Sequence, residues 1–170
     1  MTAIGQSINR FTPMQLCSYT ATLANRGTRY KATFLKRVVS DDYTDLIKNN
    51  EPVILSTYDI CDEAYMAYSE GMQLVAHDKD GTAFKTFAEY PVRVCAKTGT
   101  AEHDAAEGES DHGGIIVYAP ANNPEIAIAV YGEQAGHGSS MANIAKDILD
   151  AWFFNADIPG DVVTDENRVS

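Results

Sequence analysis

Val94-Cys95-Ala96-Lys97-Thr98-Gly99-Thr100-Ala101-Glu102 lies near the middle of the chain, where small apolar residues give way to a lysine, two threonines and a glycine. An apolar run of this kind predicts a buried strand. The glycine would let another backbone or a ligand approach the strand, because it has no Cβ. A lysine with two neighbouring hydroxyls suits an anion, although a single strand lysine more often protects the edge of a sheet.

Two further extended segments follow along the chain. Gly114 to Tyr118 is short and apolar, and Glu125 to Tyr131 places isoleucine and valine at alternate positions. Together with a first strand over Val92 to Ala96, these segments predict an antiparallel meander of three strands. The helices on either side of them in the sequence are expected to cover this sheet.

The N-terminal third predicts a helix followed by little regular structure. Thr12-Pro13-Met14-Gln15 is a capping box with proline in the first turn, and it predicts a helix from about Pro13 to Arg26 that Gly27 ends. Ala32 to Val39 predicts a short strand. The residues after it, up to Asn50, predict a polar connector.

Two more helices are expected. Asp59 could cap a helix that continues to Val75, and Ser139 or Ser140 could cap the last one. The apolar residues of the last helix share one predicted face, formed by Ile144, Ile148, Leu149 and Trp152. The predicted fold class is therefore α/β (α+β), an antiparallel β-sheet flanked by helices.

The composition is that of one packed domain. The chain has 170 residues, 45% of them hydrophobic, and a formal net charge of −11. No nucleic-acid partner is expected, because an acidic chain lacks the clustered cations that bind a phosphate backbone. No apolar run is long enough to span a membrane, and the N-terminus has no signal-peptide pattern, so the chain as given is expected to be soluble. Three widely spaced cysteines predict neither a disulfide framework nor a zinc site.

Two other kinds of site have weaker support. Acidic and histidine residues gather in Ala101 to His112, but they lack the rigid spacing of metal ligands, so we interpret this segment as a solvated loop and expect neither metal nor cofactor. Lys97-Thr98 is similar to the end of a phosphate-binding loop, yet the upstream glycine and the following helix are missing. His77 and His137 are isolated in the sequence and receive no role.

The sequence K-T-G-T-A-E at Lys97 to Glu102 resembles the third active-site motif of class B penicillin-binding protein transpeptidases. Other landmarks of that family follow in the family's order. They are Ile4-Gly5-Gln6, Thr12 to Leu16, Leu23 to Gly27, Glu70-Gly71-Met72, Gly81-Thr82-Ala83, His112, Tyr118-Ala119-Pro120 and Asn123 to Ala127. The chain thus resembles the C-terminal half of such a transpeptidase domain, in the penicillin-binding transpeptidase and serine β-lactamase-like fold. This incomplete domain is expected over residues 1–155, with a polar tail at 156–170.

The resemblance implies a role for each residue of the K-T-G-T motif. Lys97, Thr98, Gly99 and Thr100 are expected to bind the carboxylate end of a D-Ala-D-Ala stem peptide or of a β-lactam. Lys97 and Thr100 are also expected to be catalytic, Thr100 through a backbone N–H of the oxyanion hole. The family's nucleophilic serine lies in S-x-x-K, and no serine of this chain has a lysine three residues later. The chain alone is therefore expected to be inactive.

Two alternatives to a transpeptidase stay open. A β-lactamase or a β-lactam sensor shares the K-T-G motif, and a noncatalytic binding or scaffold piece of the cell-wall machinery would have the fold without the reaction. The resemblance implies a place at the outer face of a bacterial cytoplasmic membrane, for which this chain shows no anchor. Because part of the fold is missing, we expect the isolated chain to associate with itself or with the upstream half of the domain.

Overall fold

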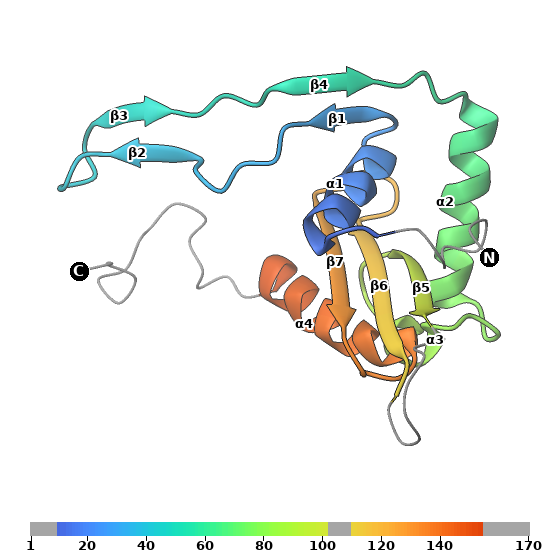
Figure 1. Ribbon diagram of the computed structural model, residues 1–170. Coiled ribbons are helices and arrows are strands. Elements are labelled where there is room, and N and C mark those ends of the chain that lie inside the picture. Colours follow the sequence, from blue (N-terminus) through green and yellow to red (C-terminus); the bar gives the residue numbers. More distant parts are fainter. Residues whose placement is uncertain (1–9, 102–109, 155–170) are drawn as a thin grey trace.

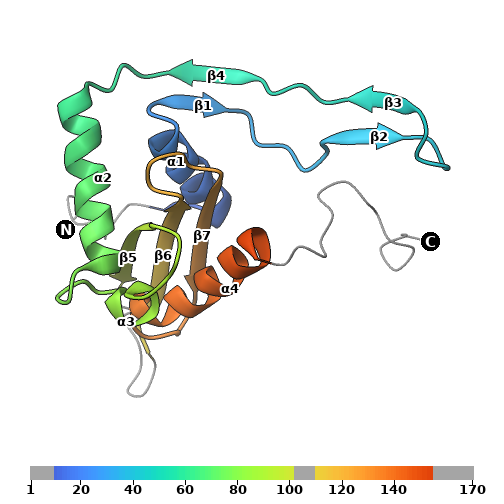
Figure 2. The same ribbon diagram turned by 180° about the vertical axis from the view of Figure 1, so that it is seen from behind.

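The computed structural model describes residues 10–101 and 110–154 (Figure 1). A three-stranded sheet lies beside its helices, and a long two-stranded arm extends away from them, as the two opposite views show (Figures 1 and 2). The helices are α1 Pro13–Ala24, α2 Asp62–His77, α3 Phe84–Phe87, the short 3-10 helix η2 Gly138–Met141, and α4 Ala142–Phe153. The strands are β1 Thr28–Tyr30, β2 Arg37–Val39, β3 Leu46–Asn49, β4 Ile54–Thr57, β5 Cys95–Ala101, β6 His112–Ala119 and β7 Ile126–Gly132.

Strands β5, β6 and β7 form the antiparallel meander that the sequence predicts. The register of the first pair places Lys97 opposite Ile116 and Gly99 opposite Gly114. Strand β5 begins at Cys95, later than predicted, and continues through the K-T-G-T motif to Ala101. The motif is therefore part of an edge strand, because among residues 10–101 and 110–154 β5 pairs only with β6.

Helices cover both faces of the sheet, as its alternating side chains require. On one face, α3, η2 and α4 close a core that contains the fully buried Val94, Ala96 and Val117. On the opposite face, residues of α1 and α2 pack on the fully buried Cys95 and Tyr118. Successive residues of β5 thus enter different cores, and the path of the strand is fixed from both sides.

Helix α1 begins at the capping box that its sequence predicts. Thr12 Oγ1 accepts a hydrogen bond of 3.2 Å from the N–H of Gln15, and Gln15 Oε1 accepts one of 2.8 Å from the N–H of Thr12. The helix ends at Ala24, before the predicted Arg26. Gly27 follows with a φ of +112°, and a Cβ at this position would clash with the backbone carbonyl of Tyr58. Glycine is needed here for both reasons.

The chain between α1 and α2 forms the arm, and two predictions are wrong there. The strand predicted over Ala32 to Val39 is regular only in β2, and the predicted connector before Asn50 contains β3. Strand β1 pairs with β4 and β2 pairs with β3, both antiparallel. Most side chains of these strands are exposed on both faces of the ribbon. Such a ribbon has no buried face, so its sequence carries no alternating apolar pattern.

Helices α2 and α4 begin later than predicted. Cys61 rather than Asp59 precedes the first turn of α2, and the Cys61 side chain makes no capping hydrogen bond. Ser139 and Ser140 lie inside η2, and α4 continues from it at Ala142. No helix among residues 10–101 and 110–154 is long and apolar enough to cross a membrane.

The predicted apolar face of α4 is only partly buried. Leu149 is fully buried, whereas Ile144, Ile148 and Trp152 are 47%, 40% and 57% exposed. The residues that accompany Leu149 in the core are alanines, so the helix lies close to the sheet and its larger apolar side chains point elsewhere. Of the four residues predicted to share this face, only Leu149 is thus part of the core.

Candidate functional site

The K-T-G-T motif forms the exposed second half of β5. Lys97, Gly99 and Thr100 are exposed and Thr98 is half-buried, whereas Cys95 and Ala96 just before them have no exposed surface. The strand therefore changes from a core element to a surface element within two residues. Its edge away from β6 has no partner strand among the described residues, so the motif is open to a ligand on that side.

The lysine and the two hydroxyls belong to opposite faces of the strand. Lys97 is two residues after Cys95, so it lies on the same face of the strand, the face covered by α1 and α2. Thr98 and Thr100 lie on the opposite face, which they share with Ala96. The Lys97 ammonium folds along the strand and donates a 2.5 Å hydrogen bond to the carbonyl oxygen of Thr98. A ligand can meet all three side chains only at the free edge of β5.

Each threonine hydroxyl contacts a different loop. Thr98 Oγ1 lies 2.6 Å from Thr82 Oγ1, in the turn that joins α2 to α3. Thr100 Oγ1 accepts a hydrogen bond of 3.2 Å from the backbone N–H of Gly138, the first residue of η2. Loops from two distant parts of the sequence thus fix the hydroxyls of one strand.

Two glycines shape the strand in different ways. A Cβ on Gly99 would meet nothing within 4 Å, so the space beside it is free for a ligand. A Cβ on Gly138 would clash with the backbone of Gly99 and lie 2.5 Å from the carbonyl oxygen of Gly114. Gly138 therefore brings η2 into direct contact with the backbone of β5 and β6. Gly99 leaves the site open, and Gly138 supports it from the other side.

His77, to which the sequence assigned no role, lies at the start of this strand. Its Nε2 accepts a hydrogen bond of 3.0 Å from the backbone N–H of Val94. Burial and the nearby Arg93 lower the pKa of His77 below its ordinary value of 6.5. A histidine in the last turn of a helix gives no sequence signal for such a contact, because its partner is a backbone group seventeen residues away.

Two residues before Lys97, Cys95 makes a buried polar contact with α2. Cys95 Sγ is 3.7 Å from Ser69 Oγ of α2. Burial raises the pKa of the Cys95 thiol, so the neutral thiol is favoured. A neutral buried thiol is a poor nucleophile, and we assign Cys95 a packing role.

The acidic segment before β6 gathers no metal ligands in the described residues. His103 and Asp104 lie outside those residues, and His112 Nδ1 accepts a hydrogen bond of 3.0 Å from the N–H of Gln134. Residues 10–101 and 110–154 contain no group of three or more His, Cys, Asp or Glu side chains that could hold a metal ion.

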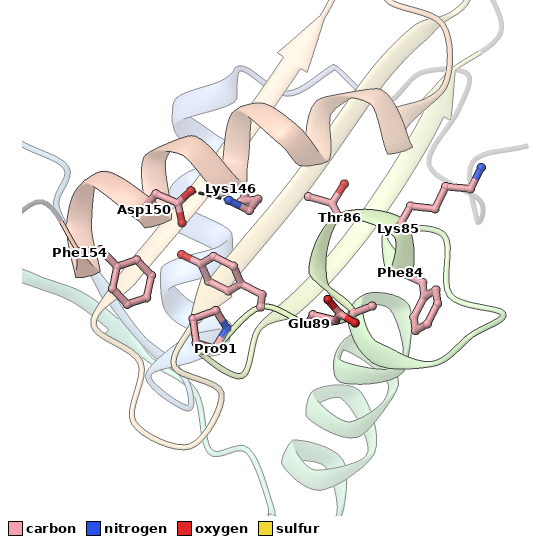
Figure 3. A pocket seen from close by; sticks show the side chains of 10 residues that line it. Phe84, Lys85, Thr86, Glu89, Pro91, Lys146, Asp150 and Phe154 are labelled. Atoms are coloured by element: carbon pink, nitrogen blue, oxygen red, sulfur yellow. Dashed lines mark hydrogen bonds and ion pairs between the residues drawn. The ribbon is translucent and has the colours of Figure 1, made fainter.

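Two cavities lie away from the motif. One, of 640 Å³, is bordered by α3 and α4, and its Lys146 and Asp150 form an ion pair of 2.5 Å (Figure 3). The other, of 730 Å³, lies between α1 and the base of the arm and is lined mainly by apolar side chains such as Met14 and Leu55. Neither cavity contains a residue of the K-T-G-T motif.

A sheet with helices on both faces and a K-T-G-T edge strand defines the class of the serine transpeptidases and β-lactamases. The model of the family described as the penicillin binding protein transpeptidase domain matches residues 1–150. The chain belongs to this family.

Several relatives share this domain. The chain is 33% identical over 162 residues to penicillin-binding protein 2B of Streptococcus pneumoniae, covering 88% of this chain and 23% of that protein. It is 30% identical over 175 residues to the peptidoglycan D,D-transpeptidase MrdA of Escherichia coli, covering 93% of this chain and 27% of that protein. The chain thus spans about a quarter of the length of these curated relatives.

Solved structures have the same fold. Penicillin-binding protein 2B of S. pneumoniae superposes with a TM-score of 0.74 at 30% identity, covering 88% of this chain and 26% of that one. The imipenem acyl-enzyme complex of penicillin-binding protein A from M. tuberculosis superposes with a TM-score of 0.73 at 26% identity, covering 89% of this chain and 33% of that one. The expected fold, a C-terminal portion of the transpeptidase domain, is confirmed.

Proposed function

We propose that this chain supplies the substrate-binding strand of a peptidoglycan D,D-transpeptidase. The observation that carries the proposal is the open edge of β5, where Lys97 and the hydroxyls of Thr98 and Thr100 flank the unobstructed Gly99. A cation with two hydroxyl donors suits a carboxylate. The C-terminal carboxylate of a D-Ala-D-Ala stem peptide has this chemistry, and a β-lactam carries a carboxylate in the corresponding place.

The reaction proceeds by acyl transfer. A serine Oγ attacks the carbonyl carbon of the peptide bond between the two D-alanines, and its proton passes to a base. The C–N bond breaks, and the terminal D-alanine leaves with a proton on its amine. An amine of a neighbouring stem peptide then attacks the acyl-serine and releases the serine. During both attacks the backbone N–H of Thr100 stabilises the oxyanion, a role worth roughly 10²- to 10³-fold in rate for one such donor.

The upstream half of the domain supplies the serine in this proposal, because no serine here is followed by lysine three residues later. Apolar side chains that would contact this partner are exposed on α4, where Trp152 is 57% exposed, and beside the larger cavity, where Phe11 is 64% exposed. Strand β7 also presents an edge without a partner strand among the described residues. The protein that contains both halves would act in the bacterial cell envelope, where peptidoglycan is made.

The test of Lys97 uses that longer protein and a fluorescent penicillin. Lys97→Ala should slow covalent labelling strongly, because the carboxylate loses its cation. The free energy of unfolding should change by no more than about 0.5 kcal/mol, as expected for an exposed side chain. Lys48→Ala, which changes another exposed strand lysine, in β3 of the arm, is the matched control and should label normally. Normal labelling of Lys97→Ala would refute the role of the strand in substrate binding.

A further inference from the structure

The turn Gly81-Thr82-Ala83 contacts the substrate-binding strand through a pair of hydroxyls. Thr82 Oγ1 lies 2.6 Å from Thr98 Oγ1, a distance at the short end for a hydrogen bond between hydroxyl groups. Building on the function proposed above, we propose that Thr82 is a positioning residue that directs the hydroxyl proton of Thr98 toward the carboxylate of the ligand. This contact also gives the Gly81-Thr82-Ala83 landmark of the sequence a structural role.

The backbone of the turn is held firmly on the end of α2. The N–H of Gly81 donates to the carbonyl of Asp78 at 2.8 Å, and the N–H of Ala83 donates to the carbonyl of Val75 at 3.0 Å. A Cβ on Gly81 would lie 2.5 Å from that same Val75 oxygen, so only glycine fits. Ala83 is 2% exposed and belongs to the core under α3. The side chain of Thr82 therefore projects from a fixed backbone position.

The direction of the hydrogen bond between Thr82 and Thr98 follows from the single proton that each hydroxyl carries. A threonine hydroxyl has one proton and two lone pairs, and a carboxylate can only accept. Thr98 can donate to a ligand carboxylate only if its contact with Thr82 is one in which Thr82 donates. The resulting chain runs from Thr82 O–H to Thr98 O–H to the carboxylate, and each bond polarises the next.

The second hydroxyl of the strand has an equivalent arrangement. The N–H of Gly138 can only donate, and it occupies a lone pair of Thr100 Oγ1. This leaves the Thr100 proton free to point at a ligand. Both hydroxyls are thus supplied with a donor from a rigid loop, Thr98 by a side chain and Thr100 by a backbone group. The side-chain donor is the one that a substitution can remove.

The experiment measures the second-order rate constant of acylation by a penicillin, in the longer protein that carries the serine. Thr82→Val removes the hydroxyl and keeps the shape, and it should lower this rate constant about 5-fold, as expected for one net hydrogen bond. Thr82→Ser keeps the donor and should restore most of the rate. With the methyl ester of the same penicillin, which lacks the anionic carboxylate, Thr82→Val and the unmodified protein should differ much less.

Thr86→Val is the matched control. Thr86 also donates its hydroxyl to a side chain, Asn143 Oδ1 at 3.0 Å, but away from the strand. The Thr86→Val variant should be acylated by the penicillin and by its methyl ester at the rates of the unmodified protein. All variants should unfold at the same temperature as the unmodified protein. Thr82→Ala gives the same comparison if Thr82→Val does not fold.

The outcomes separate the two proposals. An unmodified protein that is not acylated at all refutes the proposed function. An acylated unmodified protein whose Thr82→Val variant reacts at the same rate overturns the positioning role. Equal slowing with penicillin and its ester, or no recovery in Thr82→Ser, also overturns it, because a general packing defect would produce those results.

Discussion

His77 Nε2 accepts a hydrogen bond of 3.0 Å from the backbone N–H of Val94, so the last turn of α2 holds the residue that precedes β5. The nitrogen can accept only while it is unprotonated. Burial and Arg93 lower the pKa of His77 and keep it in that form. The start of strand β5 therefore depends on a neutral histidine.

This contact predicts a pH dependence. The unfolded chain binds the His77 proton at the ordinary pKa of 6.5, and the folded chain binds it only at lower pH. The stabilising contribution is therefore complete above pH 6.5 and is lost as the pH falls toward the lower pKa of the folded state. Hydrogen exchange of the Val94 segment, corrected for intrinsic rates, should show less protection at about pH 5 than at about pH 8. In His77→Gln this difference should disappear, and its persistence would refute the role of His77.

The two glycines of the site predict opposite effects of the same substitution. Gly138→Ala should destabilise the longer protein by about 1–3 kcal/mol, because the new Cβ overpacks the backbone of β5 and β6. Gly99→Ala should leave the unfolding temperature unchanged or slightly higher, because its Cβ enters open space. Only Gly99→Ala should slow penicillin acylation without a loss of stability. Thermal unfolding and labelling rates measure both effects, and a stable Gly138→Ala protein would contradict the close contact.

The cysteines predict an order of reactivity. Cys61 is exposed, whereas Cys95 is buried and its burial raises the pKa of its thiol. Because the thiolate is the reactive form, a maleimide should modify Cys61 quickly and leave Cys95 unmodified until the protein unfolds. Peptide mass spectrometry at successive times measures this order. Rapid native labelling of Cys95 would show that α2 does not cover the strand as described.

Much of the fold could be predicted from local signals. The capping box at Thr12 and the alternating strands after Val92 identify α1 and the meander, because each pattern has a local physical cause. The arm could not be predicted, since a ribbon exposed on both faces leaves no periodic pattern. Which residues of α4 are buried could not be predicted, because the contacts of this helix depend on how closely its alanines approach the sheet.

The candidate site, too, could be predicted only in part. The K-T-G-T motif could be found by its resemblance to a known pattern. Thr82 and Gly138 contact the motif itself, and His77 contacts Val94 just before the strand, over sequence separations of 16, 38 and 17 residues. Two of those contacts involve a backbone group, which no side-chain pattern marks. Only Thr82 was already part of a landmark in the sequence.

The most direct test of the central claim is reconstitution of the active site from two separately produced halves. This chain and the upstream half are each incubated with a fluorescent penicillin, and neither should carry a label that survives denaturation. The mixture should be labelled on the upstream serine, and labelling should be lost when this chain carries Lys97→Ala. A stable adduct on a serine of this chain alone, or an unlabelled mixture whose halves sediment together, would contradict the account.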